Sequence, residues 1–273
     1  MPESERFLDH DIGFDEYVTG NGFIDLCERI GATFCKIDFV HEFSGREAPV
    51  FVTHNGDYHV NAARFALRPR GLRRWFAQNK QVSSDLVEGI PIGLENMVLQ
   101  VSAASQMGRF ASEIPGALEK AKRIDALHQK DLSKKRNVYA NMNAMTYPDE
   151  RLPLLDYLRR LPWITCTDRL PIAKYYRDLA RHRFVVCPRG NGTDCHRVWE
   201  ALYLKTVPIV RSSVVMNEFR DLPILFVGSW EDLTERFLDE RYEEMMSRRY
   251  DLGRMRMSYW AARVAEAVRE AAG

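Results

Sequence analysis

Short apolar segments alternate with longer segments of helical character along most of the chain, and this alternation limits the fold more than any other feature of the sequence. Apolar runs such as Phe184–Cys187 and residues 206–210 suit strands that are buried on both faces, which is typical of parallel sheets. The segments between such runs contain many helix-forming residues and are long enough to cross back over a sheet. We therefore expect an α/β protein with helices on both faces of its parallel sheets.

The same patterns predict the position of each element. In the N-terminal half the predicted strands are 32–43, 49–53, 74–79 and 89–93. The predicted helices are 14–30, interrupted by Gly20-Asn21-Gly22, a stretch that extends toward Leu67, and 110–130. In the C-terminal half the predicted strands are 137–141, 163–166, 184–187, 206–210 and 223–227, and the predicted helices are 151–161, 172–181, 193–204, 230–248 and 253–272.

The basic run Lys134-Lys135-Arg136 separates these two sets of elements. A chain of 273 residues is long enough for two domains. We predict two Rossmann-like lobes whose parallel sheets face each other across a cleft. The predicted division is a first lobe at 1–132, a second lobe at 133–252 and a terminal helix at 253–273. This helix either returns to the first lobe or mediates dimerisation.

Composition excludes several classes of protein. The 39 basic and 38 acidic side chains give a net charge of +1, which argues against a dedicated nucleic-acid-binding protein. No apolar run approaches the roughly 18 residues that a transmembrane helix needs, and the N-terminus does not resemble a secretory signal. Five cysteines without CxxC spacing indicate reduced thiols, so we expect a cytoplasmic protein with no transmembrane segment.

The segment Phe184–Leu202 has the order of a buried strand, a glycine-containing turn and a helix. Such an order directs backbone N–H groups and a helix N-terminus to one point, which attracts phosphate. Arg189 follows the strand end, where a guanidinium can contact two phosphate oxygens. Gly190 and Gly192 are expected to allow close approach of the backbone and to adopt positive φ angles. Thr193 or Asp194 would cap the helix that follows.

The helix itself is expected to carry His196, Arg197 and Glu200 close to its N-terminus. A phosphate would be repelled by Glu200, whereas two ribose hydroxyls would suit its carboxylate, as in dinucleotide sites. The pattern therefore predicts a site for a nucleoside diphosphate. The alternative is an ion pair between Asp194 and Arg197 on the helix surface, with Glu200 in solvent. Neither GxxxxGK[ST] nor GxGxxG is present, which argues against P-loop and dinucleotide chemistry.

At these residues the chain resembles the exostosin-like glycosyltransferases, family 47 of the glycosyltransferases, including their short bacterial and viral members. The resemblance rests on Cys187-Pro188-Arg189-Gly190, Arg197, Glu200-Ala201 and Val207-Pro208-Ile209-Val210, and it continues through residues 226–237 with Trp230 and Leu233. It covers roughly the C-terminal half of the chain. The stem and second transferase domain of the large animal members have no counterpart here, which argues against polymerisation of heparan-type chains.

The resemblance implies a GT-B fold in which the lobe at 1–132 binds the acceptor and the lobe at 133–252 binds the nucleotide-sugar. It also implies transfer of a hexosyl or pentosyl group, usually from a UDP-sugar, with inversion and without an obligatory metal. Arg189 and Gly190 would contact the diphosphate, Glu200 the ribose, and Arg197 the departing nucleotide. Ser212 and Ser213 would close the pocket. The full predicted donor-binding set is Arg189, Gly190, Asn191, Thr193, Asp194, His196, Arg197, Glu200, Ser212 and Ser213. No metal ligand and no cofactor beyond the donor are expected.

An inverting transfer needs a base that removes the proton of the acceptor hydroxyl. The turn that follows the 49–53 strand concentrates titratable groups, and we predict Asp57 as the base with His54 as second choice. The alternative is a plain turn in which Asp57 caps the next helix. Glu95 and Asn96, after the 89–93 strand, would either line the cleft or cap local structure.

The leading hypothesis is therefore a glycosyltransferase in glycan biosynthesis that uses a glycan or glycoconjugate acceptor and no nucleic acid. The first alternative is a GDP-fucose-type transferase, because lobes of the GT-B type look alike at this level. The second is a glycan- or nucleotide-binding module without catalytic activity.

Overall fold

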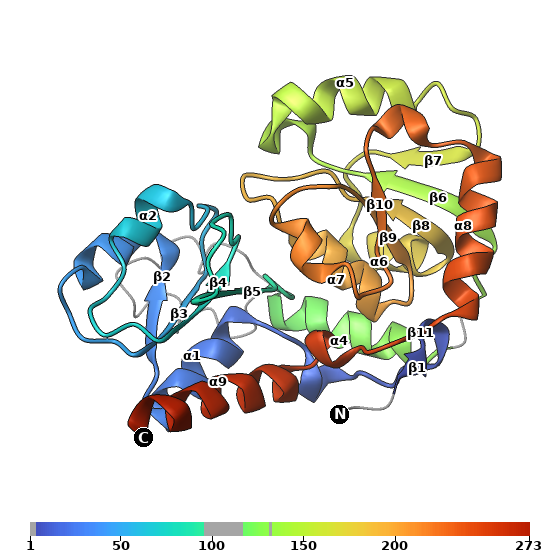
Figure 1. Cartoon of the computed structure of the whole chain (residues 1–273). Coiled ribbons are helices and arrows are strands. Elements are labelled where there is room, and N and C mark those ends of the chain that lie inside the picture. Colours follow the sequence, from blue (N-terminus) through green and yellow to red (C-terminus); the bar gives the residue numbers. More distant parts are fainter. Residues whose placement is uncertain (1–3, 96–116, 131–132) are drawn as a thin grey trace. The chain divides into compact units, whose positions relative to one another are not determined.

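A computed structural model describes residues 4–95, 117–130 and 133–273 of the chain (Figure 1). The predicted contact residue Asn96 and the first part of the predicted helix 110–130 lie outside these residues. The described chain is mixed α/β, with one parallel sheet of five strands and one of four, and is compatible with a Rossmann-like fold. The prediction of parallel sheets with intervening helices is confirmed.

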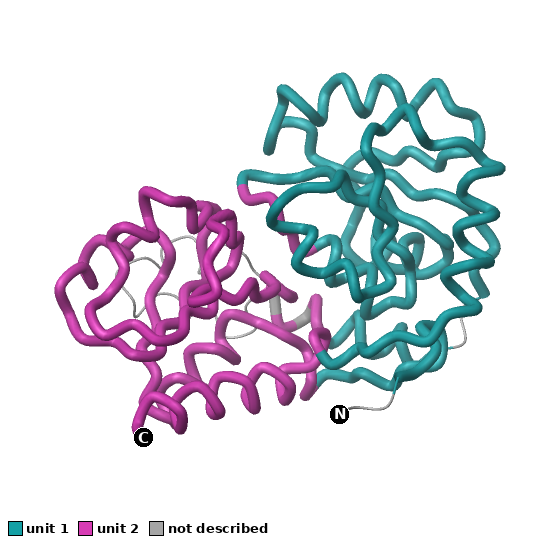
Figure 2. Tube along the Cα trace, viewed as in Figure 1, with its two compact units in different colours: residues 1–14, 122–191, 197–253 teal, residues 15–121, 192–196, 254–273 magenta. Residues whose placement is uncertain are grey.

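The chain forms two compact units, coloured separately in Figure 2. Unit 1 comprises residues 1–14, 122–191 and 197–253, and unit 2 comprises residues 15–121, 192–196 and 254–273. The first predicted boundary follows residue 132, whereas these units divide between residues 121 and 122. Residues up to 14 belong to the same unit as most of the C-terminal half, and the short segment 192–196 belongs to unit 2.

Unit 1 is built on the five-stranded parallel sheet, whose strand order is β10-β9-β8-β6-β7. Its strands are β6 Arg136–Asn141, β7 Ile164–Thr167, β8 His182–Val186, β9 Val207–Arg211 and β10 Leu225–Val227. The apolar side chains of β8 and β9 are buried on both faces of the sheet, as their unbroken apolar sequences predict. In the register of the sheet, Val138 of β6 lies opposite Phe184 of β8.

The order of these strands creates a topological switch point. The chain leaves β6 for β7 on one side and then returns to β8 on the other side. Where the connections from two neighbouring strands run in opposite directions, a crevice forms at the carboxyl ends of those strands. In open α/β sheets, ligands bind in this crevice. In unit 1 this crevice lies between the segments that follow β6 and β8.

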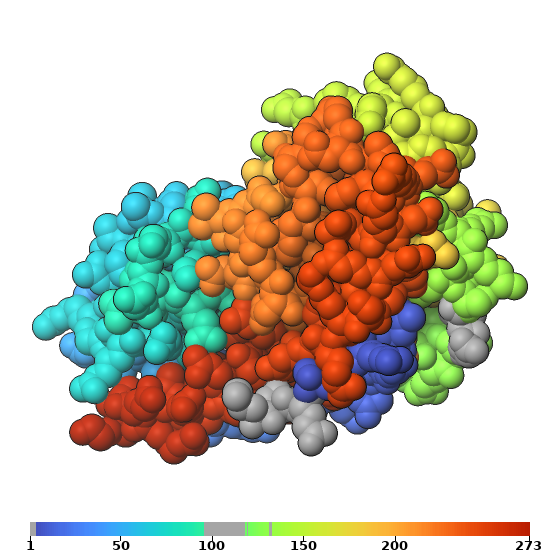
Figure 3. Space-filling view, turned by 45° about the vertical axis from the view of Figure 1, so that its right-hand side comes forward, coloured from blue at the N-terminus to red at the C-terminus, as the bar shows by residue number. Residues whose placement is uncertain are grey.

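Helices of unit 1 connect the strands and form part of its surface. They are α5 Pro148–Leu158, α6 Ile172–Ala180, α7 His196–Tyr203 and α8 Glu235–Ser247, with 3-10 turns η1 Phe7–Asp9, η6 Ala144–Thr146, η7 Met216–Phe219 and η8 Trp230–Asp232. The 3-10 turn η9 Gly253–Met255 begins at the last residue of unit 1 and continues into unit 2. Helix α4 Ala117–His128 contains the division between the units, and β1 Glu5–Arg6 pairs with β11 Arg249–Tyr250. Figure 3 shows α8 in orange-red on the surface, where it exposes charged side chains.

Unit 2 contains a four-stranded parallel sheet with the order β2-β3-β4-β5. Its strands are β2 Thr33–Lys36, β3 Val50–His54, β4 Arg74–Gln78 and β5 Val87–Ile90. The predicted strand 32–43 is wrong in its second half, because β2 ends at Lys36 and the 3-10 turn η3 Ile37–Phe43 follows. Lys36 pairs with His54, the last residue of β3, so no partner strand continues beyond this point.

Helices α1 Gly20–Ile30 and α9 Met257–Ala272 pack on one core of unit 2, and α2 Ala62–Ala66 precedes β4. Trp260 and Val264 of α9 are buried there with Phe23 of α1. Residues 20–22 do not interrupt a helix, as the sequence suggested, but form its first turn. Thr19 caps this helix by accepting the N–H of Gly22 at 3.1 Å, and the glycines fall where N–H groups have no partner within the helix.

Candidate functional site

The predicted phosphate-binding turn follows β8 directly and therefore lies at the switch point of unit 1. The Arg189 guanidinium lies 4.3 Å from the ring of Tyr147, which belongs to the segment after β6. Side chains from both walls of the crevice thus meet. Arg189 also donates to the carbonyl oxygens of Gly190 at 3.2 Å and Asn191 at 2.8 Å. These contacts hold the guanidinium in one orientation, with donors left for a ligand.

A second arginine, which sequence reasoning missed, holds the turn in place. Arg151 of α5 is only 4% exposed. Its guanidinium donates to the carbonyl oxygens of Arg189 at 2.7 Å, Pro188 at 3.3 Å and Asn143 at 2.9 Å. It therefore ties the segment after β6 to the segment after β8. The available signal was its position on the buried face of α5, three and seven residues before Leu154 and Leu158.

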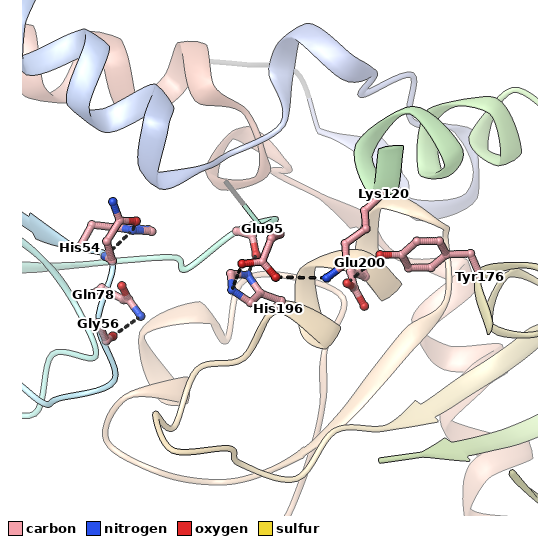
Figure 4. Close-up of polar contacts among 10 residues, drawn as sticks. His54, Gly56, Gln78, Glu95, Lys120, Tyr176, His196 and Glu200 are labelled. Carbon is pink, nitrogen blue, oxygen red and sulfur yellow. Dashed lines mark hydrogen bonds and ion pairs between the residues drawn. The ribbon is translucent and has the colours of Figure 1, made fainter. Parts of the chain in front are cut away.

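Glu200 on α7 is buried, and its carboxylate is held by two tyrosines of α6, of which Figure 4 shows Tyr176. The hydroxyl of Tyr176 donates to one carboxylate oxygen at 2.9 Å, and that of Tyr175 donates to the other at 3.0 Å. Burial and the nearby carboxylate raise the pKa of Tyr175 well above its ordinary value. Glu200 is thus a fixed acceptor with a lone pair on each oxygen still available, rather than a solvated surface acid.

Other predicted residues of unit 1 lie around this centre. Arg197 is near the hydroxyl of Tyr175, where its charge counteracts part of the rise in pKa. Ser212 accepts a hydrogen bond from Arg220 at 3.2 Å, and Ser213 accepts the N–H of Met216 at 3.1 Å. The hydroxyl of Ser213 therefore caps the turn η7, which is a local structural role.

Three predicted donor residues, Thr193, Asp194 and His196, belong to unit 2, where they lie near the carboxyl ends of its strands. Asp194 is 2% exposed, and its carboxylate accepts the N–H of Ile92 at 2.7 Å, just after β5. Its own N–H donates to the side chain of Asn79 at 3.1 Å, just after β4. The hydroxyl of Thr193 lies 2.7 Å from Nε2 of His59, after β3. The structure thus divides the predicted donor set between the two units.

Two local predictions for this segment are wrong. Helix α7 begins at His196, so neither Thr193 nor Asp194 is its N-cap. Gly190 and Gly192 were expected to adopt positive φ angles, but neither of them does so in the described structure. The backbone at Gly192 lies close to Asn79, because a Cβ atom there would lie 2.9 Å from Nδ2 of that residue. A side chain at this position would therefore push the segment away from β4.

His196 lies in a polar group of unit 2 with Glu95 and Lys120 (Figure 4). Its Nδ1 lies 2.8 Å from the carbonyl oxygen of Gly93, so this nitrogen donates and Nε2 is the acceptor in the neutral ring. Nε2 lies 4.0 Å from Glu95, whose other oxygen binds Lys120 at 3.1 Å. Burial opposes ionisation of Glu95, but His196 and Lys120 lower its pKa below the ordinary value.

The two predicted bases occupy different environments in unit 2. His54 is 1% exposed; its Nδ1 accepts the N–H of Asn55 at 2.8 Å, and its Nε2 donates to the carbonyl oxygen of Pro91 at 3.0 Å. Asp57 is exposed in the turn that follows. Gln78 anchors this turn by donating to the carbonyl oxygen of Gly56 at 2.9 Å (Figure 4). His54 thus supports the turn from beneath, and Asp57 faces solvent.

The burial of His54 predicts a pH-dependent stability. Burial lowers the pKa of His54 from 6.5 to about 4, so between these values the unfolded chain binds more protons than the folded one. The contribution of neutral His54 to the free energy of unfolding is therefore present above pH 6.5 and is lost as the pH falls toward 4. When the pH is lowered from 7 to 4.5, the free energy of unfolding measured by urea denaturation should fall by about 2 kcal/mol more in the wild type than in His54→Gln. The matched control is His41→Gln, at an exposed histidine; equal losses in wild type and His54→Gln would contradict this assignment.

In the described ranges 4–95, 117–130 and 133–273, no helix is both long and apolar enough to span a membrane. Within these same ranges, histidine, cysteine and carboxylate side chains form no group of three or more that would hold a metal ion.

The described residues thus form a mixed α/β protein with two parallel sheets, which is compatible with a Rossmann-like fold. Comparison of the sequence with protein-family models finds no match, and comparison with curated proteins finds no significant similarity.

Proposed function

We propose that the protein is a glycosyltransferase that uses a nucleotide-sugar donor bound at the carboxyl edge of the unit 1 sheet. The observation that carries this proposal is the position of Arg189 at the switch point, opposite Tyr147 of the neighbouring segment. A guanidinium in a crevice of this kind suits a diphosphate. The fixed carboxylate of Glu200, on the next helix, suits ribose hydroxyls.

The resemblance to exostosin-like transferases supports the reaction type, and the comparisons neither add to it nor replace it. In the proposed arrangement the two units are the lobes of a GT-B fold, with the acceptor on unit 2. A base takes the proton of an acceptor hydroxyl while that oxygen attacks the anomeric carbon. The bond from the anomeric carbon to the diphosphate breaks, the nucleoside diphosphate leaves, and the configuration inverts. Arg189 and Arg197 would neutralise the leaving group, so the proposed reaction needs no metal.

Asp57 is the proposed base, because its carboxylate is exposed at the carboxyl edge of the unit 2 sheet. Both ring nitrogens of His54 are already hydrogen-bonded, which leaves this residue a positioning role for the turn. Thr193, Asp194 and His196 bind the same edge of unit 2, and we assign them to the acceptor side of the proposed site.

Replacement of Arg189 by alanine tests the donor site. Because a charge-assisted hydrogen bond contributes about 1.5–3 kcal/mol, the variant should bind nucleoside diphosphate about 10- to 100-fold more weakly. Calorimetric titration with UDP, GDP and CDP, without added metal, measures this change. Arg160→Ala, at an exposed arginine just beyond α5, is the matched control and should bind as the wild type does.

The same titration separates the alternatives. If the folded protein bound none of the three nucleotides, the donor-site proposal would be wrong. Nucleotide binding without any release of nucleotide from nucleotide-sugars and glycans would favour a binding module. Selective binding of GDP would favour the GDP-fucose-type alternative over a UDP-sugar transferase.

A further inference from the structure

A cavity of about 460 Å³ opens in unit 1 between the N-terminal turn of α5 and the segments that follow β9 and β10. This volume is within the range of small-molecule sites, about 300–1,000 Å³. Three aromatic residues line the cavity: Tyr147, Tyr157 and Trp230. Aromatic rings offer flat apolar faces on which a planar ring system can stack.

The cavity shares a wall with the proposed donor site. Tyr147 lines the cavity, and its ring also contacts the guanidinium of Arg189 at 4.3 Å. A ligand whose diphosphate binds Arg189 would therefore have an uncharged part within reach of the cavity. For a nucleotide-sugar, that part is either the base with its ribose or the sugar.

The charges of the cavity decide which ligands suit it. Asp149, Glu150 and Glu231 contribute three carboxylates, and Arg211 contributes the one cation among its lining residues in the described chain. Such a cavity repels phosphate and favours groups that donate hydrogen bonds. Asp149 and Glu231 are exposed to solvent, whereas Glu150 is half-buried. Glu150 is therefore the carboxylate with the strongest influence on a bound ligand.

Glu150 is also held in a defined position. The indole N–H of Trp230 donates to its Oε1 at 3.3 Å, and Trp230 itself is 6% exposed. One oxygen of Glu150 is thus fixed by a buried neighbour. The carboxylate keeps further lone pairs for a ligand, because each oxygen can accept two hydrogen bonds.

Among the common nucleotide bases, guanine alone carries two adjacent donors, N1–H and the 2-amino group, on its Watson–Crick edge. These match the two oxygens of a carboxylate. Uracil offers one N–H between two carbonyl oxygens, which a carboxylate repels. Adenine and cytosine each place an acceptor beside their amino group. An aromatic cavity with an oriented carboxylate therefore discriminates for guanine and against the other bases.

We infer that this cavity binds the base of a guanine nucleotide and that Glu150 reads its Watson–Crick edge. This inference rests on the proposed function, and it replaces the UDP-sugar expected from the resemblance by a GDP-sugar. The base would lie beside Tyr147, with the diphosphate directed to Arg189 on the other side of that residue.

Calorimetric titration of the full chain with GDP, UDP and inosine diphosphate tests the inference. GDP should bind at least about 10-fold more tightly than UDP, because two charge-assisted hydrogen bonds are replaced by repulsion. Inosine diphosphate lacks the 2-amino group and should bind more weakly than GDP. This comparison uses the wild-type protein and so does not depend on the folding of a variant.

The Glu150→Gln variant should bind GDP about 10-fold more weakly than the wild type. It should bind UDP more tightly than the wild type, because the amide no longer repels the carbonyl oxygens of uracil. Glu243→Gln, at an exposed position of α8, is the matched control and should change neither affinity. Binding of UDP as tight as that of GDP, or a Glu150→Gln variant with wild-type preference, would overturn the inference and leave the proposed function intact. Absence of binding by all three nucleotides would overturn both.

Discussion

Replacement of Asp57 by asparagine is expected to lower kcat for glycosyl transfer by about 100- to 10,000-fold, the usual contribution of a positioned general base. The amide keeps the size and hydrogen-bonding capacity of the side chain but cannot accept the proton of the acceptor hydroxyl. Affinity for the nucleotide should not change, because the proposed donor contacts are made by residues of unit 1. The rate is measured as nucleoside diphosphate released from a nucleotide-sugar in the presence of a glycan acceptor.

The control for this prediction is Asp25→Asn, at an exposed aspartate of α1, which should retain the wild-type kcat. A wild-type kcat in Asp57→Asn would exclude Asp57 as the base. His196 would then be the residue to examine, because the carbonyl of Gly93 orients its ring so that Nε2 accepts a proton. A loss of kcat in His196→Gln, with Asp57→Asn active, would move the base to this imidazole.

Replacement of Arg151 by methionine is expected to destabilise unit 1 by about 3–5 kcal/mol, a cost similar to that of breaking a buried ion pair. The side chain is 4% exposed, and its loss leaves the carbonyl groups of Pro188, Arg189 and Asn143 without this donor. Hydrogen exchange in peptides from β8 and α5 measures the change. Nucleotide affinity should fall as well, because the backbone of Arg189 is no longer tied to α5.

Lysine at position 151 should restore only part of this stability, because one ammonium group cannot reproduce the planar fork that reaches three carbonyl oxygens. Arg160→Met removes an exposed arginine close by and should leave the exchange rates unchanged. Equal protection of β8 in the wild type and Arg151→Met would show that the turn is held by other contacts.

Much of the secondary structure could be predicted because its signals are local. Apolar runs marked β3, β4, β6, β8 and β9 within a few residues of their ends. The prediction failed where a neighbour in space decided the outcome. Strand β2 stops at Lys36 because its partner β3 ends at His54, although the sequence beyond Lys36 contains Ile37, Phe39 and Val40.

The candidate site was predictable in its position but not in its contacts. The Cys187–Gly190 turn indicated the strand end that lies at the switch point, and Arg189 was found from this pattern. Tyr147, Arg151 and the tyrosines that hold Glu200 were missed, since each comes from a different segment of the chain. His54 looked like a titratable turn residue, and its burial became visible only in the packed sheet.

The sequence by itself determined that this chain builds parallel sheets with helices between their strands, because the length and spacing of apolar runs are properties of adjacent residues. It also determined which turn carries Arg189 and the neighbouring glycines. Only the tertiary structure decided that residues 192–196 join unit 2, and that Glu150 lies beside Trp230 in an aromatic cavity. Such partners are separated by many residues in the sequence, and they meet only because the strand order brings the ends of their elements to one edge of a sheet.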